Sequence, residues 1–216
     1  MELWTMWTHL LEVTLTYLAA HFGFSEAVAI IVLTLIARAA MMPVSLTAAY
    51  RMQKNKEALE RIKPKLEELR KTFKDKPSEL AARTMALYRE NGISFFDKLT
   101  MLNIASQGVF GLGIYQSLSR SVFTSKFLWI ANLAKPDFLL TAIVGVLVLL
   151  GMALMPGTTA DTSMLLMIAI PVLISVVVVA ALPSALGIYW ATSNAVTVVQ
   201  TLALRGLLAR QRRLAV

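Results

Sequence analysis

Arg38 is the only charged residue in an otherwise apolar stretch that runs from residue 27 to residue 50. An arginine at the centre of a membrane-spanning helix costs at least about 2.5–3.5 kcal/mol, and its side chain could not reach either membrane surface from there. The other apolar stretches contain no Asp or Glu that could pair with it. We therefore expect water around the guanidinium, with backbone carbonyls as the alternative partner. Such a guanidinium could donate charge-assisted hydrogen bonds to the carbonyl or carboxylate oxygens of another molecule.

Uncharged polar residues on two further apolar stretches indicate where this water would lie. Three share one face of residues 99–118, and four recur at helical spacing in residues 185–204. Singly, such residues more often hydrogen-bond one helix to another. Together they predict a hydrophilic groove that opens to the cytoplasm and to lipid, is sealed towards the outside, and has Arg38 at its blind end. These residues are Asn103, Ser106, Gln107, Trp190, Asn194, Thr197 and Thr201.

Other kinds of site are disfavoured by composition. The chain has no cysteine and only two histidines, and no phosphate-binding G-x-x-x-x-G-K-[ST] motif occurs. We therefore expect no catalytic residue, no metal and no cofactor, and hence no enzyme. The net charge of +8 flanks the apolar stretches, so it is better explained by membrane topology than by binding to nucleic acid.

The elements that must position these residues are membrane helices. Apolar residues make up 57% of the chain and charged residues 16%, and the mean hydropathy is +0.65, whereas soluble domains average about 45–50% apolar and about 25% charged. The predicted fold is an all-α membrane protein with a bundle of five transmembrane helices. The spans are residues 24–50, 99–118, 138–155, 163–182 and 185–204.

The distribution of Lys and Arg predicts the orientation of this bundle. Residues 51–98, 156–162 and 205–216 together hold 17 basic residues, whereas residues 119–137 and 183–184 hold three. Basic loops stay on the cytoplasmic side. We therefore expect the N-terminus outside, the C-terminus with its short basic tail inside, and a location in the bacterial plasma (inner) membrane.

Residues 1–23 differ from the five spans. Seven apolar residues recur at helical spacing, with Glu2, His9 and Glu12 towards another side, which favours an amphipathic helix lying in the outer membrane interface. A sixth span or a signal peptide is the alternative. The apolar residues are Leu3, Met6, Trp7, Leu10, Val13, Tyr17 and Leu18.

The cytoplasmic segment 51–98 is predicted to form a coiled-coil-like helical hairpin. Its first arm carries a heptad pattern and is predicted to kink at Pro64, and its second is expected to start at Ser78 as N-cap and stop at Asn91-Gly92. The hairpin would dock ribosomes or targeting factors, or be a plain solvated surface. The heptad residues are Met52, Leu59, Ile62, Leu66, Leu69 and Phe73, those on one side of the second arm are Leu80, Thr84, Leu87 and Tyr88, and the candidate docking residues are Lys63, Pro64, Lys65, Arg70 and Lys71.

Several segments resemble one protein family, in order and spacing, over about residues 20–207. Residues 23–25, 33–38 and 42–44 are similar to the first core helix of the YidC/Oxa/Alb membrane insertases. Ile-Lys-Pro-Lys-Leu at 62–66 and Met-Ala-Leu-Tyr at 85–88 resemble their cytoplasmic hairpin. Residues 127–133 resemble their external loop, and residues 182–194 their last hairpin. Residues 93–98 depart from the proline-containing entry to the second span that is usual in the family.

The resemblance implies an insertase or chaperone for small or single-span membrane proteins, in a short form without the large external domain. It implies that Arg38 contacts the translocating segment, and that Thr34, Gln107, Tyr189 and Trp190 are groove or contact positions. Implied partners are nascent or newly made client proteins and the lipid bilayer, with a ribosome, a targeting-factor receptor or the Sec translocon as further candidates. The alternatives are a small solute or anion transporter and a non-catalytic assembly subunit.

Overall fold

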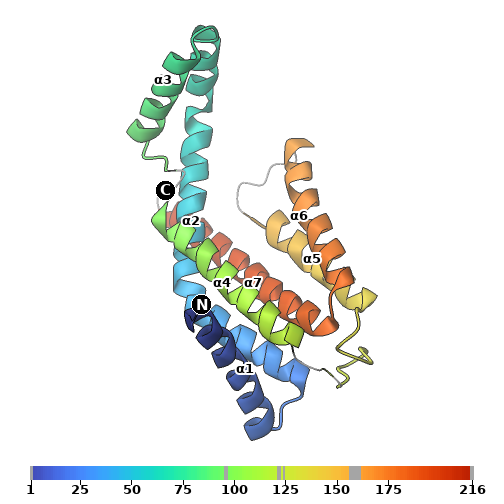
Figure 1. Ribbon diagram of the computed structural model, residues 1–216. Helices are drawn as coiled ribbons and strands as arrows, with labels where there is room; N and C mark the ends of the chain where they lie inside the picture. Colours follow the sequence, from blue (N-terminus) through green and yellow to red (C-terminus); the bar gives the residue numbers. More distant parts are fainter. Residues whose placement is uncertain (1, 95–96, 121–122, 124, 156–161, 215–216) are drawn as a thin grey trace. The chain divides into compact units, whose positions relative to one another are not determined.

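The computed structural model describes residues 2–94, 97–120, 123, 125–155 and 162–214, without the side chains of 120, 162–167, 212 and 214 (Figure 1). In these ranges the regular secondary structure is entirely α-helical, apart from an isolated bridge between Phe127 and Ile130, so the predicted all-α class is confirmed. The helices are α1 (Glu2–Phe22), α2 (Glu26–Thr72), α3 (Pro77–Glu90), α4 (Lys98–Arg120), α5 (Phe138–Ala153), α6 (Thr162–Ala181) and α7 (Ser184–Leu214).

The chain divides into two compact units, and both boundaries fall inside helices. The first unit comprises residues 1–42 and 105–216, and the second comprises residues 43–104. The boundaries therefore lie within α2 and within α4. The predicted end of the first span at residue 50 is not marked by a break, because α2 continues through it to Thr72.

Among the described helices, α2 is long and apolar enough to cross a membrane, and most of its apolar window is not buried within the protein. The helix α5 and the stretch Ile168–Ala181 of α6 are apolar but shorter. The helix α4 contains glycines and polar residues, and these lower its mean hydropathy. The five predicted spans thus remain a prediction.

In the first unit, α5 packs against α6 and α7 (Figure 1). A larger apolar core joins α1, the N-terminal part of α2, α4 and the start of α7 through Ile30, Ile114 and Leu133, each of which is completely or almost completely buried. The segment before α5 contributes to the same core. Burial of such side chains stabilises each by about 1.5–3 kcal/mol relative to exposure to water.

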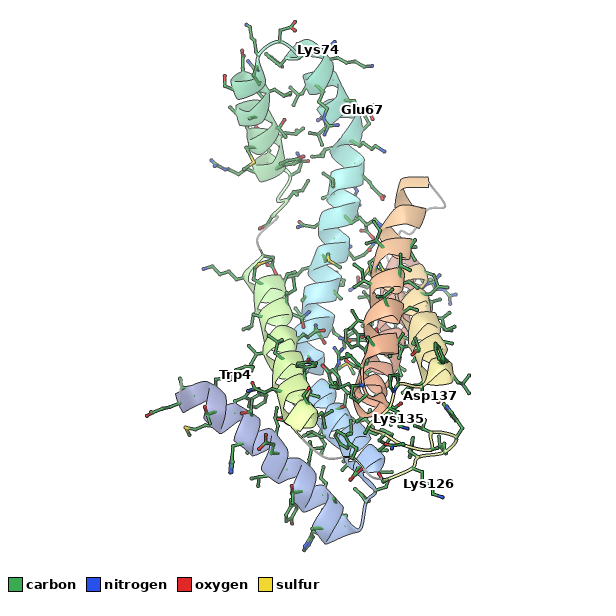
Figure 2. The ribbon with its side chains drawn as sticks, turned by 45° about the vertical axis from the view of Figure 1, so that its right-hand side comes forward. Trp4, Glu67, Lys74, Lys126, Lys135 and Asp137 are labelled. Atoms are coloured by element: carbon green, nitrogen blue, oxygen red, sulfur yellow. The ribbon has the colours of Figure 1, made fainter. Side chains whose placement is uncertain are left out.

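The connection between α4 and α5 is tied to three helix starts. Asp137 caps α5 by accepting a hydrogen bond of 2.7 Å from the Leu140 amide, and it also accepts one of 3.1 Å from the Trp129 indole. The Ser184 hydroxyl donates to the Lys135 carbonyl at 2.6 Å, at the start of α7. Glu26, in the first turn of α2, accepts a bond of 2.6 Å from the Ser125 hydroxyl. Figure 2 shows Lys126, Lys135 and Asp137 in this connection.

The second unit contains the hairpin formed by the C-terminal part of α2 and by α3. Ile62 and Leu66, from the centre of the predicted heptad pattern, are buried together with Ile93, and Leu59 and Tyr88 pack against them. Met52, at its start, is 45% exposed. On α3, the predicted inner residues Leu80, Thr84, Leu87 and Tyr88 are the half-buried apolar and hydroxyl side chains.

Two details of the hairpin correct the sequence prediction or extend it. Ser78 is not the N-cap of α3: the cap is Lys76 and the helix begins at Pro77, since a proline fits the first helical turn, where no amide hydrogen bond is lost. Pro64 lies inside α2 without ending the helix. The predicted stop is confirmed, because Asn91 caps α3 and Gly92 adopts a φ of 65°, which a glycine does without strain.

Polar contacts close the base of the hairpin. The Asn55 side chain donates to the Ser94 carbonyl and accepts from the Ser94 amide at 3.2 Å. Asp97 accepts hydrogen bonds from the Thr100 amide at 3.0 Å and from Arg51 at 2.9 Å. Asp97 therefore serves as the cap of α4, at the point where the sequence departs from the family pattern, and it also ties α4 to α2 within this unit.

The cap at Asp97 predicts a local dependence on pH. The pKa of Asp97 is lowered, first by the Thr100 amide and then by Arg51. The stabilisation is therefore present above the ordinary pKa of about 3.9 and is lost as the pH falls through the lowered value. We expect the protection of the Thr100 amide against hydrogen exchange to fall several-fold between pH 6 and pH 3. The variant Asp97→Asn, which can still cap the helix, should lose this pH dependence, and an equal dependence in both proteins would contradict the assignment.

Candidate functional site

The Arg38 side chain is held by neutral groups from two other helices. Its Nε donates to the Ser193 hydroxyl at 2.8 Å, and its Nη2 donates to the same oxygen. Its Nη1 donates to Oε1 of Gln107 at 3.1 Å. In the part of the chain that the structure describes, no carboxylate pairs with Arg38. The half-buried guanidinium is thus tied to α7 and α4 but keeps its full positive charge uncompensated.

Packing between α4 and α7 brings these partners to Arg38. Gln107 lies one turn before Gly111 on α4, and Ser193 lies one turn after Tyr189 on α7. The Phe110 and Tyr189 rings are 6.2 Å apart in a tilted arrangement. A Cβ atom added to Gly111 would lie 3.1 Å from the Tyr189 hydroxyl, so the missing side chain allows the close approach of the two helices.

Among the described residues, two cavities adjoin Arg38. The smaller, about 60 Å³, is lined by Ala37, Arg38, Met41, Gln107, Phe110 and Tyr189. The larger, about 430 Å³, reaches from Arg38 to Tyr115 on α4 and to Leu182 before α7. Arg38 and Tyr189 line both cavities. The remaining residues around the larger cavity are Gly108, Gly111, Leu112, Leu186, Trp190, Ser193 and Asn194.

The structure brings together five of the residues that the sequence suggested. Arg38, Gln107, Tyr189, Trp190 and Asn194 all line one or both cavities. The Asn194 amide donates to the Trp190 carbonyl at 2.8 Å, one turn back on the same helix. These five residues contribute one cation, two aromatic side chains and two amides to the walls of the two cavities.

Other predicted residues lie elsewhere. Thr34 is fully buried, and its hydroxyl donates to the Ile30 carbonyl at 2.7 Å, so it lines neither cavity. The hydroxyls of Thr197 and Thr201 donate to carbonyls of their own helix at 3.1 Å and 2.9 Å. Ser106 is half-buried and lines neither cavity, and Asn103 belongs to the second unit. The hairpin residues Lys63, Pro64, Lys65, Arg70 and Lys71 are all exposed.

Ser193 is the main residue that sequence reasoning missed. It accepts two hydrogen bonds from Arg38 and is 6% exposed. Its position one turn after Tyr189 was the available signal. The predicted polar stripe through Trp190 and Asn194 lies one residue further round α7.

The arrangement can donate hydrogen bonds and offer a positive charge, and it contains no nucleophile paired with a base. In the described ranges, no three His, Asp or Glu side chains converge so that they could hold a metal ion. A guanidinium has five N–H donors, and Arg38 uses three of them on Ser193 and Gln107. The site is therefore suited to binding carbonyl or carboxylate oxygens.

The contacts of Arg38 predict a large effect for a small substitution. Ser193→Ala removes the acceptor of two of its hydrogen bonds, and we expect the free energy of unfolding to fall by about 1.5–3 kcal/mol because a charged group loses its partner. The measurement is denaturant unfolding in mixed micelles of detergent and lipid.

The neighbouring Thr192→Ala is the matched control, since the Thr192 hydroxyl donates to the Ile188 carbonyl of its own helix at 2.8 Å. It should change the free energy by less than about 0.5 kcal/mol. In an Arg38→Met background the cost of Ser193→Ala should largely vanish. Equal losses for both serine and threonine variants would contradict the interpretation.

Comparisons with known proteins agree with the resemblance read from the sequence. Residues 17–211 match the model of the family described as 60Kd inner membrane protein. Membrane protein insertase YidC 1 of Listeria monocytogenes serotype 4b is 32% identical, over 91% of this chain and 71% of the relative. Membrane protein insertase YidC of Oceanobacillus iheyensis is 30% identical, over 87% and 77%. That of Caldanaerobacter subterraneus is 29% identical, over 83% and 85%.

The family match includes α2 to α6 in full and nearly all of α7, so it contains Arg38 and its partners Gln107 and Ser193. Together with relatives at about 30% identity over most of their own length, it shows that this chain belongs to the 60Kd inner membrane protein family, that of the YidC membrane protein insertases.

Proposed function

We propose that this protein inserts small or single-span membrane proteins into the bacterial plasma membrane, with Arg38 and the cavity beside it as the contact site for the client. The observation that carries the proposal is the uncompensated guanidinium, held by Ser193 and Gln107 at the wall of a cavity. Membership of the insertase family supports the activity.

The physical difficulty in insertion is the polar part of the client. Moving unpaired backbone and polar side chains from water into hydrocarbon costs several kcal/mol for each group. Arg38 lowers this cost by donating charge-assisted hydrogen bonds to carbonyl or carboxylate oxygens of the passing segment. No covalent step is involved, and the apolar part of the client drives its own transfer into lipid.

The dimensions of the larger cavity limit how much of a client it can hold. One turn of an α-helix with its side chains occupies roughly 400–600 Å³, given a diameter of 10–12 Å and a pitch of 5.4 Å. The cavity of about 430 Å³ therefore accommodates about one turn. A spanning helix needs about 20 residues, so most of it lies in lipid while a short segment contacts Arg38.

The client is proposed to enter the site from the cytoplasmic side. In the predicted topology, Thr197 and Thr201 lie on the cytoplasmic side of Arg38, whereas Tyr115 and Leu182 lie on the outer side. The cavity extends from Arg38 towards the latter pair and is lined there mainly by apolar side chains. A client arriving from the cytoplasm would pass the threonine stripe, meet Arg38, and then place apolar residues in the cavity.

The topology of the bundle is part of the proposal. The spans are residues 24–50, 99–118, 138–155, 163–182 and 185–204, with the N-terminus outside and the C-terminus in the cytoplasm. Exposed apolar side chains on α5 and α6, such as Phe138, Val146, Leu173 and Val177, support contact with lipid. The basic hairpin and the tail supply the positive charge on the cytoplasmic side.

The sectors of α1 support its placement in the outer interface. One sector is buried within the protein and includes Thr8, Leu11 and Leu18. A second carries exposed apolar side chains, including Met6 and Leu10, and a third carries polar residues. A helix with one sector each for protein, lipid and water suits an interface and does not suit a lipid-surrounded span.

The hairpin is proposed as the docking surface for the machinery that delivers clients. Its residues Lys63, Lys65, Arg70 and Lys71, with Pro64 between the first two, are exposed on α2. The apolar core of the hairpin fixes this face, because Ile62 and Leu66 are turned inward. A ribosome, a targeting-factor receptor and the Sec translocon are the candidate partners.

Insertion by the purified protein tests the function. Liposomes containing only this protein should insert a short single-span client, measured by protease protection, well above empty liposomes. Arg38→Ala should lower insertion at least several-fold because the charge is lost, and Arg38→Lys should restore much of it. Arg210→Ala, on the exposed tail, is the control. Full activity of Arg38→Ala would contradict the role of the charge, and saturable transport of small anions without insertion would favour a transporter.

Single cysteines test the topology, since the chain contains none of its own. A cysteine at Lys126 or Lys135 should react with a membrane-impermeant maleimide added outside intact cells. A cysteine at Lys63 or Arg210 should react only after the membrane is permeabilised. Reaction of Lys63→Cys from the outside would overturn the proposed orientation.

A further inference from the structure

The first 15 residues of α1 lie before the segment that matches the family model, yet they make specific contacts with the wall of the Arg38 site. We propose that α1 is a positioning element. Trp7 and Leu11, packed against Gly113 of α4, fix the distance between α4 and α7 and so set the width of the larger cavity. The consequence for insertion rests on the proposed function, whereas the consequence for the cavity does not.

Hydrogen bonds join α1 to α4. The Trp4 indole donates to Oε1 of Gln116 at 2.6 Å, and the Ser117 hydroxyl donates to the Thr8 carbonyl at 3.2 Å. Both Thr8 and Ser117 are buried. Figure 2 shows Trp4 on the part of α1 that lies beside α4. These hydrogen bonds fix the position of α1 along α4, in addition to the apolar contacts between the two helices.

A further hydrogen bond depends on Gly113. The Trp7 indole donates to the Val109 carbonyl at 3.4 Å. In a helix, the carbonyl of residue 109 points towards residue 113, so a side chain there would cover it. A Cβ atom added to Gly113 would lie 2.9 Å from Leu11 Cδ1 and 3.0 Å from Trp7 Cδ1, and closer still to Trp7 Nε1. The glycine is therefore the seat into which Trp7 and Leu11 fit.

Aromatic contacts continue from this seat to the site. The Trp7 and Phe110 rings are 6.1 Å apart, and the Phe110 and Tyr189 rings are 6.2 Å apart, both in tilted arrangements. Tyr189 lines both cavities beside Arg38. Within two turns of α4, Gly113 thus receives α1 on one side and Gly111 receives Tyr189 of α7 on the other. Because α4 is packed between the two, withdrawal of Trp7 leaves it free to move away from α7.

The positioning face of α1 is separate from its lipid face, so that the two roles can be tested independently. Leu11 is 3% exposed and contributes to the core, whereas Met6 and Leu10 are 66% and 55% exposed. A helix that served only as a membrane anchor would depend on Met6 and Leu10. A helix that positions α4 depends on Trp7 and Leu11.

Trp190 is a natural reporter, since it lines the larger cavity and the chain has only four tryptophans. With Trp4 and Trp129 replaced by phenylalanine, both Trp7→Phe and Trp7→Ala leave Trp190 as the only tryptophan. Acrylamide quenching then measures access to the cavity. We expect Trp7→Ala to raise the quenching constant about twofold over Trp7→Phe, which keeps the ring contact with Phe110. Adding Leu10→Ala to the Trp7→Phe protein should leave the quenching constant unchanged.

A second variant keeps an aromatic ring at position 7. In the Trp7→Phe protein, Gly113→Ala should also raise quenching, because the added methyl displaces the packed side chains. Gly206→Ala, where an added Cβ meets nothing within 4 Å, is the matched control. If Trp7→Ala fails to fold, as judged by helix content, the Gly113→Ala protein carries the test. Equal quenching across the folded Trp7 and Gly113 variants would overturn the proposal.

Insertion assays on the same proteins separate the two proposals. Trp7→Ala should lower insertion several-fold, and Leu10→Ala less. One outcome is that quenching rises in the Trp7→Ala protein while neither Trp7→Ala nor Arg38→Ala lowers insertion. In that case α1 sets the width of the cavity, but the proposed client site is wrong. If Arg38→Ala abolishes insertion and Trp7→Ala changes neither quenching nor insertion, the client site stands and the positioning role is wrong.

Discussion

The energetic cost of placing one guanidinium among apolar helices governs the architecture of the first unit. Arg38 has no carboxylate partner among the described residues, so neutral oxygens from α4 and α7 must stabilise it. Each of those helices therefore carries polar groups and small residues where a plain membrane helix would carry leucine. The cavities lie where these residues leave space. A charge that is solvated but not neutralised remains able to attract a passing oxygen, which is the property that the proposed function requires.

Glycine and aromatic residues on α4 convert this requirement into fixed geometry. Gly111 admits the Tyr189 hydroxyl and Gly113 admits Trp7, with Phe110 between the two rings. Without side chains at these two positions, helices approach α4 closely on two sides, and large rigid side chains from the neighbours fill the space. Such packing holds a cavity wall in place better than flexible aliphatic contacts would, since each aromatic ring has few rotatable bonds.

The amino-acid sequence predicted a residue's role well where a single energetic cost determined that role. It predicted the role less well where contacts between distant segments of the chain determined it. Arg38 could be identified from its type and depth alone, and the hairpin core from its heptad spacing. Ser193 could not be distinguished from a serine that bonds within its own helix, because its role depends on where α2 lies. Trp7 and Leu10 formed one apolar pattern in the sequence, whereas packing against Gly113 separates them into two faces. The fold class is accessible from periodicity, but the partner of each side chain is not.

The sequence separation of the Arg38 contacts has a consequence for the biogenesis of the protein itself. Gln107 follows Arg38 by 69 residues and Ser193 follows it by 155. At about 5–20 residues per second, the ribosome needs roughly 8–30 s to make the chain between Arg38 and Ser193. Until Ser193 is made, the second helix carries an arginine whose set of hydrogen-bond partners is incomplete. The newly made chain is thus itself a membrane protein with a poorly solvated polar residue, and its early helices present to the cell the same problem that the finished protein is proposed to solve for others.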